Sequence, residues 1–316
     1  MAELMSDQEH EYLMAVLTEI DGIGKKTATD IISLRDSFAA FESVGTERLT
    51  AVSHINESKA KRIVQRLQRV DFEKDISILE IERVLRKFLD RQYELLNNIT
   101  LDELDINVLL VKALGFTTVE EVIEFYLYQR ITRSATTAWG TEVEKIVLAA
   151  GTETIPPHEN VSVGGKKFDM KKETDETTYY IQLKSGPNTM NVGMVNSLNE
   201  MIATIEQKHT DATGMLGMTY GTERQISNQI KGNLNQFEQK ARIGAEFWEF
   251  ISEEEGYFRE LIAVIDTISE QFETRYDRSY FDLAEKKEQE LQAEWKEKYG
   301  ATGSEGLTAF IETYTS

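Results

Sequence analysis

The side chains best suited to chemistry lie between residues 168 and 191, in the run FDMKKETDETTYYIQLKSGPNTMN. Asp169 closes one short extended segment, and Gln182 and Lys184 alternate along a second one. Residues two apart on a strand project to the same face of a sheet, so Gln182 and Lys184 are expected to point together. If the two segments pair as a hairpin, Asp169 reaches the same place, and a carboxylate, an amide oxygen and an ammonium group converge there.

Such a set suits a divalent cation beside a phosphodiester group. Mg²⁺ prefers oxygen ligands and commonly takes one or two carboxylates together with phosphate oxygens of a substrate. The cation polarises the phosphate and activates a water, and a lysine near that water orients it or stabilises the charge of the transition state. The spacing alone is weakly specific, and the alternative is an ordinary amphipathic hairpin with a solvated lysine.

The residues around this set resemble type II restriction endonucleases of the PD-(D/E)XK superfamily. In several such enzymes a run like IQLKSGPNTMN, at 181–191 here, follows the catalytic strand, and some of those enzymes read GGNCC-like sites. Three further segments match the same group in the same order: RSATTAWGTEVE at 133–144, LGMTYG at 216–221 and IGAEFWEF at 243–250. The resemblance implies a central mixed β-sheet flanked by helices.

The resemblance also implies roles for individual side chains. Asp169 matches the metal-binding aspartate and Lys184 the catalytic lysine, whereas Gln182 stands where Glu or Asp is usual. Glu144 matches a helix glutamate near the metal and would supply the charge that Gln182 lacks; the alternative is a plain surface residue. All four are predicted catalytic residues, and Asp169, Gln182 and Glu144 are the predicted Mg²⁺ ligands. Glu142, two residues away on the same helix, faces elsewhere.

The loop after the second strand has polar side chains without net charge. Gly186 permits close backbone approach and Pro187 fixes φ, which is turn chemistry. Asn pairs with adenine, and Ser or Thr contacts bases or phosphates. The alternative is a polar loop that caps a helix starting near residue 192. The predicted DNA contacts here and after the strand at 213–220 are Ser185, Asn188, Thr189, Asn191 and Arg224, with Gln225, Asn228 and Lys231 as further donors or, alternatively, a solvated polar helix.

A second feature lies near the N-terminus, where LTEIDGIGKKTATDII at 17–32 resembles a helix-hairpin-helix element. Gly22 and Gly24 allow a tight turn whose N–H groups, with the next helix N-terminus, suit a phosphate, and Lys25 and Lys26 add positive charge. The run at 49–64 follows the same sequence pattern, but its turn contains no glycine. The pair resembles a tandem module that binds the backbone of duplex DNA; the alternative is a packing or dimerisation module.

Composition excludes several other classes of protein. The 316 residues include no cysteine, and four histidines lie far apart, which argues against disulfides, thiolate zinc sites and His-metal nucleases. No apolar stretch approaches a membrane span and no signal pattern begins the chain, so a cytoplasmic protein without membrane contact is expected. The net charge of −20 is unusual for a DNA-binding protein, but residues 241–316 hold 18 acidic and 8 basic residues, half of that excess.

The predicted fold is α/β, a PD-(D/E)XK core with an all-α helix-hairpin-helix domain at the N-terminus. Four parts are predicted: 1–70, the tandem module; 71–130, a helical linker or dimerisation region; 131–275, the nuclease; and 276–316, an acidic helical tail. Helices are expected at 71–100, 108–114, 119–129, 138–148, 194–208, 281–298 and within 236–273, and strands at 161–163, 167–170, 179–184 and 213–220.

The function that these expectations support is Mg²⁺-dependent, site-specific hydrolysis of phosphodiester bonds in double-stranded DNA. Palindromic sites are usually cut by homodimers, with one active site per strand. The resemblance also implies a cognate DNA methyltransferase that protects host DNA. Two alternatives stay open at this point: a repair or junction nuclease, and a DNA-binding protein without catalysis, which Gln182 favours.

Overall fold

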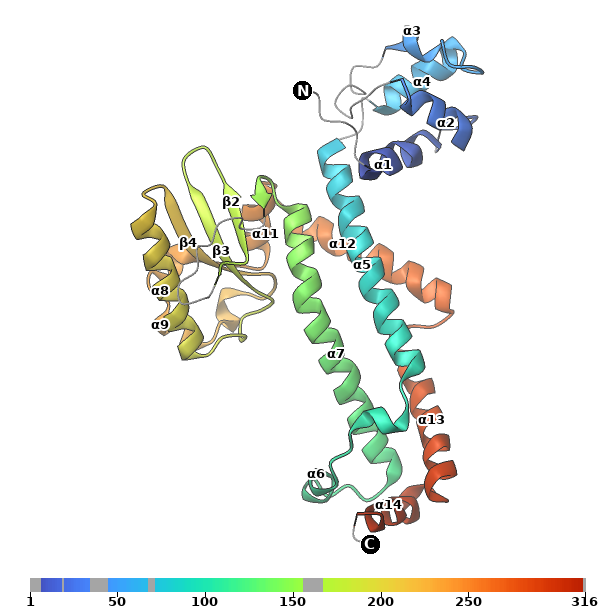
Figure 1. Cartoon of the computed structure of the whole chain (residues 1–316), viewed down its shortest axis with the longest axis vertical. Helices are drawn as coiled ribbons and strands as arrows, with labels where there is room; N and C mark the ends of the chain where they lie inside the picture. Colours follow the sequence, from blue (N-terminus) through green and yellow to red (C-terminus); the bar gives the residue numbers. More distant parts are fainter. Residues whose placement is uncertain (1–6, 19, 35–44, 68–71, 156–166, 315–316) are drawn as a thin grey trace. The chain divides into compact units, whose positions relative to one another are not determined.

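The computed structural model of the chain describes residues 7–18, 20–34, 45–67, 72–155 and 167–314 (Figure 1). The chain forms two compact units, residues 1–80 and residues 81–316. The division falls within one long helix, α5 (Phe72–Asn98). The predicted limits at residues 70, 130 and 275 stay predictions.

The first unit is made of short helices: α1 (Asp7–Thr18), α2 (Lys25–Ile32), α3 (Thr46–Leu49) and α4 (Glu57–Leu67). Their apolar residues form one core, in which Leu13, Leu17, Leu49 and Ile63 are fully buried. Ala28 and Ala60 have no exposed surface, and small side chains let helices approach closely. The predicted pair of helical hairpins is present: the backbone bonds of the α1–α2 turn recur in the α3–α4 turn.

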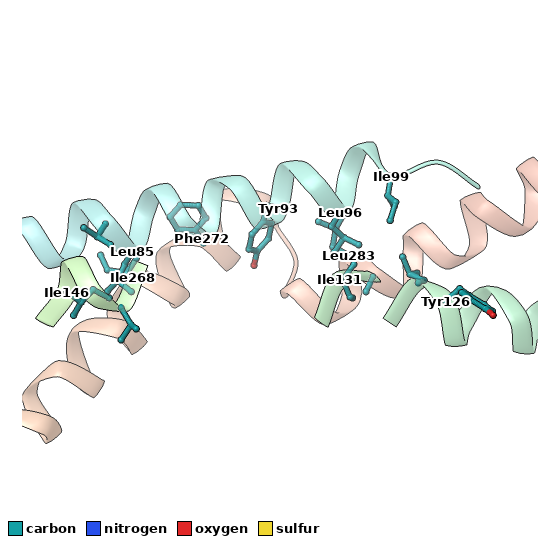
Figure 2. Packing of buried hydrophobic residues seen from close by; sticks show 14 of the residues in the cluster. Leu85, Tyr93, Leu96, Ile99, Tyr126, Ile131, Ile146, Ile268, Phe272 and Leu283 are labelled. Carbon is teal, nitrogen blue, oxygen red and sulfur yellow. The ribbon is translucent and has the colours of Figure 1, made fainter. Parts of the chain in front are cut away.

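The second unit contains a group of long helices. After α5 come η1 (Leu101–Leu104), α6 (Val108–Ala113) and α7 (Val119–Ala150), and the C-terminal part holds α12 (Tyr257–Tyr276), α13 (Tyr280–Tyr299) and α14 (Gly303–Glu312). Their shared core joins α5, α7, α12 and α13 through residues such as Leu96, Ile131, Phe272 and Leu283 (Figure 2). The residues predicted as an acidic tail therefore fold back, and Trp295 on α13 is fully buried.

The prediction of two separate helices at 119–129 and 138–148 is wrong. α7 runs unbroken through both. The helix contains no proline, and its single glycine, Gly140, costs only about 1 kcal/mol relative to alanine. Buried positions continue along the whole helix, including Ile131 and Val143, so tertiary packing stabilises the middle segment.

A five-stranded mixed sheet forms the rest of the second unit. Its strands, in spatial order, are β1 (Thr154–Ile155), β2 (Met170–Glu173), β3 (Thr178–Lys184), β4 (Ala212–Met218) and β5 (Ala241–Ile243). The β1–β2 and β2–β3 pairs are antiparallel, and the β3–β4 and β4–β5 pairs are parallel. The predicted mixed sheet is confirmed, while the strand expected at 161–163 lies outside the described residues.

Short elements surround the sheet. α8 (Val192–Lys208) connects β3 to β4, and η2 (Glu223–Gln225), α9 (Asn228–Asn233) and α10 (Phe237–Lys240) lead to β5, which is followed by α11 (Ala245–Ser252). The span 236–273, expected to be helical, thus includes a strand. β5 has only three residues, too few to show an alternating pattern.

The two faces of the sheet have separate cores, and this places the candidate site. Ile181 and Leu183 belong to the core shared with α7 and α11, whereas Tyr180 belongs to the core shared with α8. Because side chains alternate along a strand, Gln182 and Lys184 lie on the Tyr180 side. Across the part of the chain that the structure describes, no helix combines the length and the apolar character needed to cross a membrane.

Candidate active site on strands β2 and β3

Asp169 and Gln182 meet because β2 and β3 pair in antiparallel register. Met170 lies opposite Ile181, and the Asp169 N–H donates to the Ile181 carbonyl at 2.9 Å. The Gln182 side-chain amide donates to Asp169 Oδ2, and the Leu183 N–H donates to the same oxygen at 2.6 Å. One carboxylate oxygen is thus held by two donors, and no hydrogen bond from a described residue reaches the other.

Lys184 and Glu144 complete an electrostatic cluster with Asp169. Burial raises the pKa of Asp169, against the opposing effects of the Leu183 N–H, Lys184 and Gln182. The Glu144 side chain is exposed, but part of its surroundings is protein. This partial burial is the main reason that the pKa of Glu144 is raised, the negative charge of Asp169 adds to the rise, and Lys184 opposes it. Two carboxyl groups and one ammonium group therefore act on one another at this place.

Glu142 and Glu144 lie two residues apart on α7 and point in different directions, as the helical spacing predicts. Glu142 is buried and pairs with Lys145 at 2.7 Å and with Arg91 at 3.6 Å. Its charge is satisfied within the helical part of the unit. Glu144 is the one that interacts with the residues on β2 and β3.

The residues of the cluster fit a magnesium ion. Both carboxyl groups have a raised pKa, so ionisation is disfavoured at the site, and a divalent cation would offset that cost. Mg²⁺ needs only one or two carboxylates, with waters and phosphate oxygens completing its shell. The described residues contain no group of three or more His, Cys, Asp or Glu suited to a metal. The side-chain oxygen of Gln182 is therefore needed as a metal ligand. A rotation of the side-chain amide by about 180° would turn that oxygen toward the metal.

A pocket of about 280 Å³ opens beside Gln182 and Lys184. Its remaining wall comes from α8, the residues before it, and Lys167, and it is rich in methionine. The members from α8 and its start are Met190, Met194, Ser197, Leu198 and Met201. The two polar side chains of β3 thus face a hollow rather than packed protein.

The loop from Ser185 to Asn191 is held against the residues that follow β4. A Cβ at Gly186 would lie 2.3 Å from the Tyr220 ring, so a larger residue there would require the Tyr220 side chain to move. The Thr219 hydroxyl donates to the Ser185 carbonyl at 2.9 Å, and the Thr189 hydroxyl donates to the Gly186 carbonyl at 2.7 Å. The close approach expected of Gly186 is therefore made to protein, and the sequence did not indicate Tyr220 as its partner.

The other predicted DNA contacts differ in how they are used. The Asn191 side chain accepts the Met194 N–H at 3.0 Å and caps α8, as the capping alternative described, whereas Asn188 and Thr189 are exposed. Beyond β4, Arg224 and Asn228 are exposed. Gln225 closes a capping box with Thr222, and Lys231 lies 3.7 Å from Glu223. The DNA-contact roles of these residues stay predictions.

The first hairpin of the tandem leaves donors exposed. Gly22 has a φ of +82°, which favours glycine. Gly24 is the N-cap of α2, with no side-chain acceptor for the first N–H groups of that helix, and Lys25 and Lys26 are exposed. These are the features that a phosphate would use.

The second hairpin is closed by its own side chains. His54 has a φ of +70° where the first copy has Gly22. Asn56 replaces the second glycine, and its side chain accepts the Lys59 N–H at 2.9 Å. The Lys59 ammonium donates to the Gly22 carbonyl at 3.2 Å and the His54 carbonyl at 3.5 Å, which ties the two hairpins together. The sequence around 49–64 did not indicate this role of Lys59.

Comparison with known families gives two matches. Residues 75–273 match the family described as Type II restriction endonuclease EcoO109I, and residues 14–69 match the family described as SAM-like Helix-hairpin-helix tandem. No curated protein matches the chain. The restriction-endonuclease match covers more than half of the sequence and includes β2, β3 and α7. The chain therefore belongs to the EcoO109I family of type II restriction endonucleases and carries a DNA-binding helix-hairpin-helix tandem before the matched region.

Proposed function

We propose that Asp169, Gln182, Lys184 and Glu144 form the active site at which this restriction endonuclease hydrolyses DNA, with Mg²⁺ as cofactor. The observation that carries the proposal is the pairing of Asp169 with Gln182 across β2 and β3, beside Lys184 and within the electrostatic reach of Glu144. Asp169, Gln182 and Glu144 would hold the metal. When bound, Mg²⁺ supplies positive charge at the scissile phosphate and lowers the pKa of water.

Leu183 and Lys184 have separate roles in the hydrolysis. Leu183 fixes one oxygen of Asp169 through its N–H and so sets the direction of the free oxygen. Lys184, on the same face of β3 as Gln182, orients the attacking water and stabilises the extra negative charge on phosphorus in the transition state. The water oxygen bonds to phosphorus while the bond from phosphorus to the 3′ oxygen breaks. The attacking water gives up one proton to solvent and the 3′ oxygen takes one up from solvent, leaving a 5′-phosphate and a 3′-hydroxyl.

Two parts of the chain would bind the duplex. Around the site, Ser185, Asn188, Thr189, Asn191 and Arg224 offer hydrogen bonds to bases and phosphates. In the first unit, the exposed turn of Gly22 and Gly24 with Lys25 and Lys26 would hold a backbone phosphate without reading sequence. Specificity would come from the first group, and added affinity from the second.

We further propose that the enzyme acts as a homodimer on a short palindromic, GGNCC-like site. A two-fold symmetric site presents the same bases to each copy, so two identical active sites can cut both strands. A cognate methyltransferase would protect host DNA at that site.

A digest of unmethylated phage DNA with the full-length protein and Mg²⁺ tests this proposal. The wild type is expected to give discrete fragments whose ends define one site, and Asp169→Ala is expected to give none. A smear, or cutting confined to branched DNA, would contradict site-specific restriction. Discrete fragments from Asp169→Ala would move the active site away from β2 and β3.

A further inference from the structure

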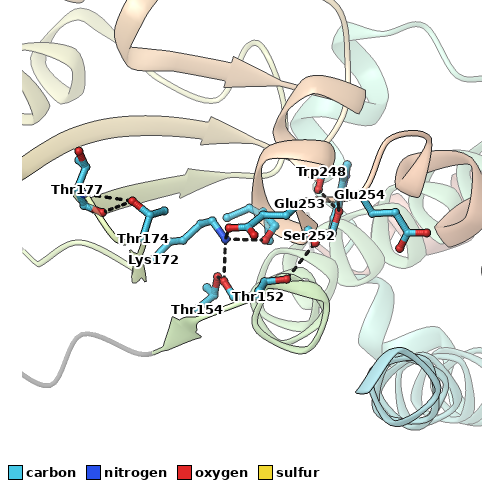
Figure 3. A network of polar contacts seen from close by, with 10 residues as sticks. Thr152, Thr154, Lys172, Thr174, Thr177, Trp248, Ser252, Glu253 and Glu254 are labelled. Atoms are coloured by element: carbon cyan, nitrogen blue, oxygen red, sulfur yellow. Dashed lines mark hydrogen bonds and ion pairs between the residues drawn. The ribbon is translucent and has the colours of Figure 1, made fainter. Parts of the chain in front are cut away.

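A charged side chain is completely buried close to the proposed active site. Lys172 lies on β2, three residues after Asp169, and only 1% of its surface is exposed. Its ammonium donates to the Thr152 carbonyl at 2.7 Å and the Ile251 carbonyl at 3.2 Å, and it pairs with Glu253 at 2.8 Å (Figure 3). All of its donors are thus directed at groups outside its own strand.

These partners come from the ends of two helices. Thr152 lies two residues after the last residue of α7, Ile251 belongs to the last turn of α11, and Glu253 is the C-cap of α11. Carbonyl groups at a helix C-terminus lack partners within the helix and carry partial negative charge. Thr152 also binds α11 directly, through its N–H to the Ile251 carbonyl at 3.1 Å and its hydroxyl to the Ser252 carbonyl at 2.9 Å. Lys172 therefore joins three elements at one point.

Two of those elements lead to the proposed metal ligands. Along α7, Glu144 lies about two helical turns, or roughly 10 Å, before the helix end at Ala150. Along β2, Asp169 lies three residues, or roughly 10 Å, before Lys172. The ammonium is thus one point where the segment that follows α7 and the segment that follows Asp169 are held together, beside the backbone pairing of β1 with β2. A shift of α7 against β2 would change the separation of the two carboxylates.

We infer that Lys172 is a positioning residue, which sets Glu144 relative to Asp169 and so prepares the site for its divalent cation. The inference rests on the proposed active site. Simple stabilisation is a weaker account, because a buried ion pair is often replaced by apolar residues without loss of stability. A bond that fixes geometry between strand and helix explains a charged residue at this place, and residues behind the ligands commonly control metal affinity.

The chain offers a matched control. Lys287 on α13 is also buried, donates to the Asn97 carbonyl at the end of α5 at 2.6 Å, and pairs with Glu290 at 2.7 Å. It has the same chemistry as Lys172 but joins two helices that carry no proposed ligand. Lys172→Met and Lys287→Met therefore each remove a buried ammonium bound to a main-chain carbonyl and a glutamate, and only the first is expected to disturb the metal site.

The experiment measures metal requirement in two ways on the full-length protein. The first readout is the Mg²⁺ concentration for half-maximal cleavage of a duplex carrying the mapped site. The second is Mn²⁺ binding to the protein–DNA complex by electron paramagnetic resonance, with each variant placed in a Lys184→Ala background to keep the DNA uncut. Lys172→Met is expected to weaken both by about 10-fold, with cleavage recovering at high Mg²⁺, whereas Lys287→Met changes them less than about 2-fold.

Equal shifts in the two variants, or a lower plateau rate for Lys172→Met at an unchanged Mg²⁺ requirement, would overturn the inference. If Lys172→Met does not fold, Glu253→Gln tests the same point, because it removes the half-exposed partner and is expected to raise the Mg²⁺ requirement about 2- to 3-fold. An unchanged requirement in Glu253→Gln would then overturn it. Asp169→Ala separates the two proposals: retained Mn²⁺ binding there contradicts the active site itself.

Discussion

The β2–β3 site and the first hairpin of the tandem are both proposed to meet DNA phosphates, but they present different atoms to them. The site brings together half-buried Asp169 and Lys184 at the paired strands and exposed Glu144 on α7, and both of its carboxyl groups have a raised pKa. The hairpin presents backbone N–H groups and exposed lysines at a glycine turn. Hydrolysis of DNA requires charged side chains that lower the stability of the folded protein, whereas binding of the DNA backbone requires only accessible hydrogen-bond donors. Substitutions in the two places should therefore have separable effects.

The largest contrast is expected from Asp169→Asn. Asparagine keeps the shape and accepts the Leu183 N–H but removes the charge that would hold Mg²⁺, so cleavage should fall by at least about 10³-fold.

The same variant should change the stability of the metal-free protein. Burial raises the pKa of Asp169, so ionised Asp169 costs stability. When folding raises the pKa of an acidic group, the protein loses stability as the pH rises from the pKa of the unfolded state to the pKa of the folded state. Without metal, the variant should melt at the same temperature as the wild type or higher, and the gap should widen from about pH 4 upward. Calorimetry across pH checks this, and a variant that melts lower at pH 7 contradicts it.

Gln182→Glu should sharpen the same contrast with a smaller effect. The new carboxylate adds a charged ligand for Mg²⁺ but faces Asp169, so the hydrogen bond between the two side chains is lost at neutral pH. We expect the Mg²⁺ concentration for half-maximal cleavage to fall about 5-fold, while the metal-free protein becomes less stable. Titration of the cleavage rate with Mg²⁺, beside thermal unfolding in EDTA, measures both. A higher Mg²⁺ requirement would show that Gln182 is not a ligand position.

The two hairpins should differ from each other in DNA affinity. Lys25 and Lys26 flank an uncapped helix start, whereas Asn56 caps the second one. The double variant Lys25→Ala/Lys26→Ala should reduce the salt dependence of DNA binding by about two phosphate contacts, without changing the cleavage rate at saturating DNA. The matched pair Lys61→Ala/Arg62→Ala should change it by less than half as much. Binding measured over a range of NaCl concentrations decides this, and equal effects would make the hairpins equivalent.

The smallest effect is expected from Lys59→Met. Its ammonium joins the carbonyls of Gly22 and His54, so its loss should destabilise the first unit by about 1 kcal/mol. The cleavage rate at saturating DNA should stay unchanged. Hydrogen exchange of the Ile23 and Ile55 amides reports on the two turns, both of which are bonded in the structure. Unchanged exchange would assign Lys59 to the surface charge alone.

Local sequence patterns predicted the strand that carries Gln182 and Lys184, but they placed the strand before it at 167–170, whereas β2 begins at Met170 and Asp169 directly precedes it. Alternation along 179–184 predicted the strand face of Gln182 and Lys184, and turn residues predicted the loop after it. The continuity of α7 and the existence of β5 were not predictable in this way, because distant packing decides both. The role of Lys172 could not be predicted for the same reason, because its partners lie near it only in the folded chain.

The measurement that most directly tests the active site is the single-turnover cleavage rate of Lys184→Ala at saturating enzyme and Mg²⁺. Lys167→Ala is the control, since Lys167 is a second ammonium at the same pocket but lies outside the strand. With equal binding of DNA in Ca²⁺, Lys184→Ala should cleave at least about 10²-fold more slowly than the wild type, and Lys167→Ala at nearly the wild-type rate. Cleavage by Lys184→Ala at the wild-type rate would contradict the placement of the reaction on β3.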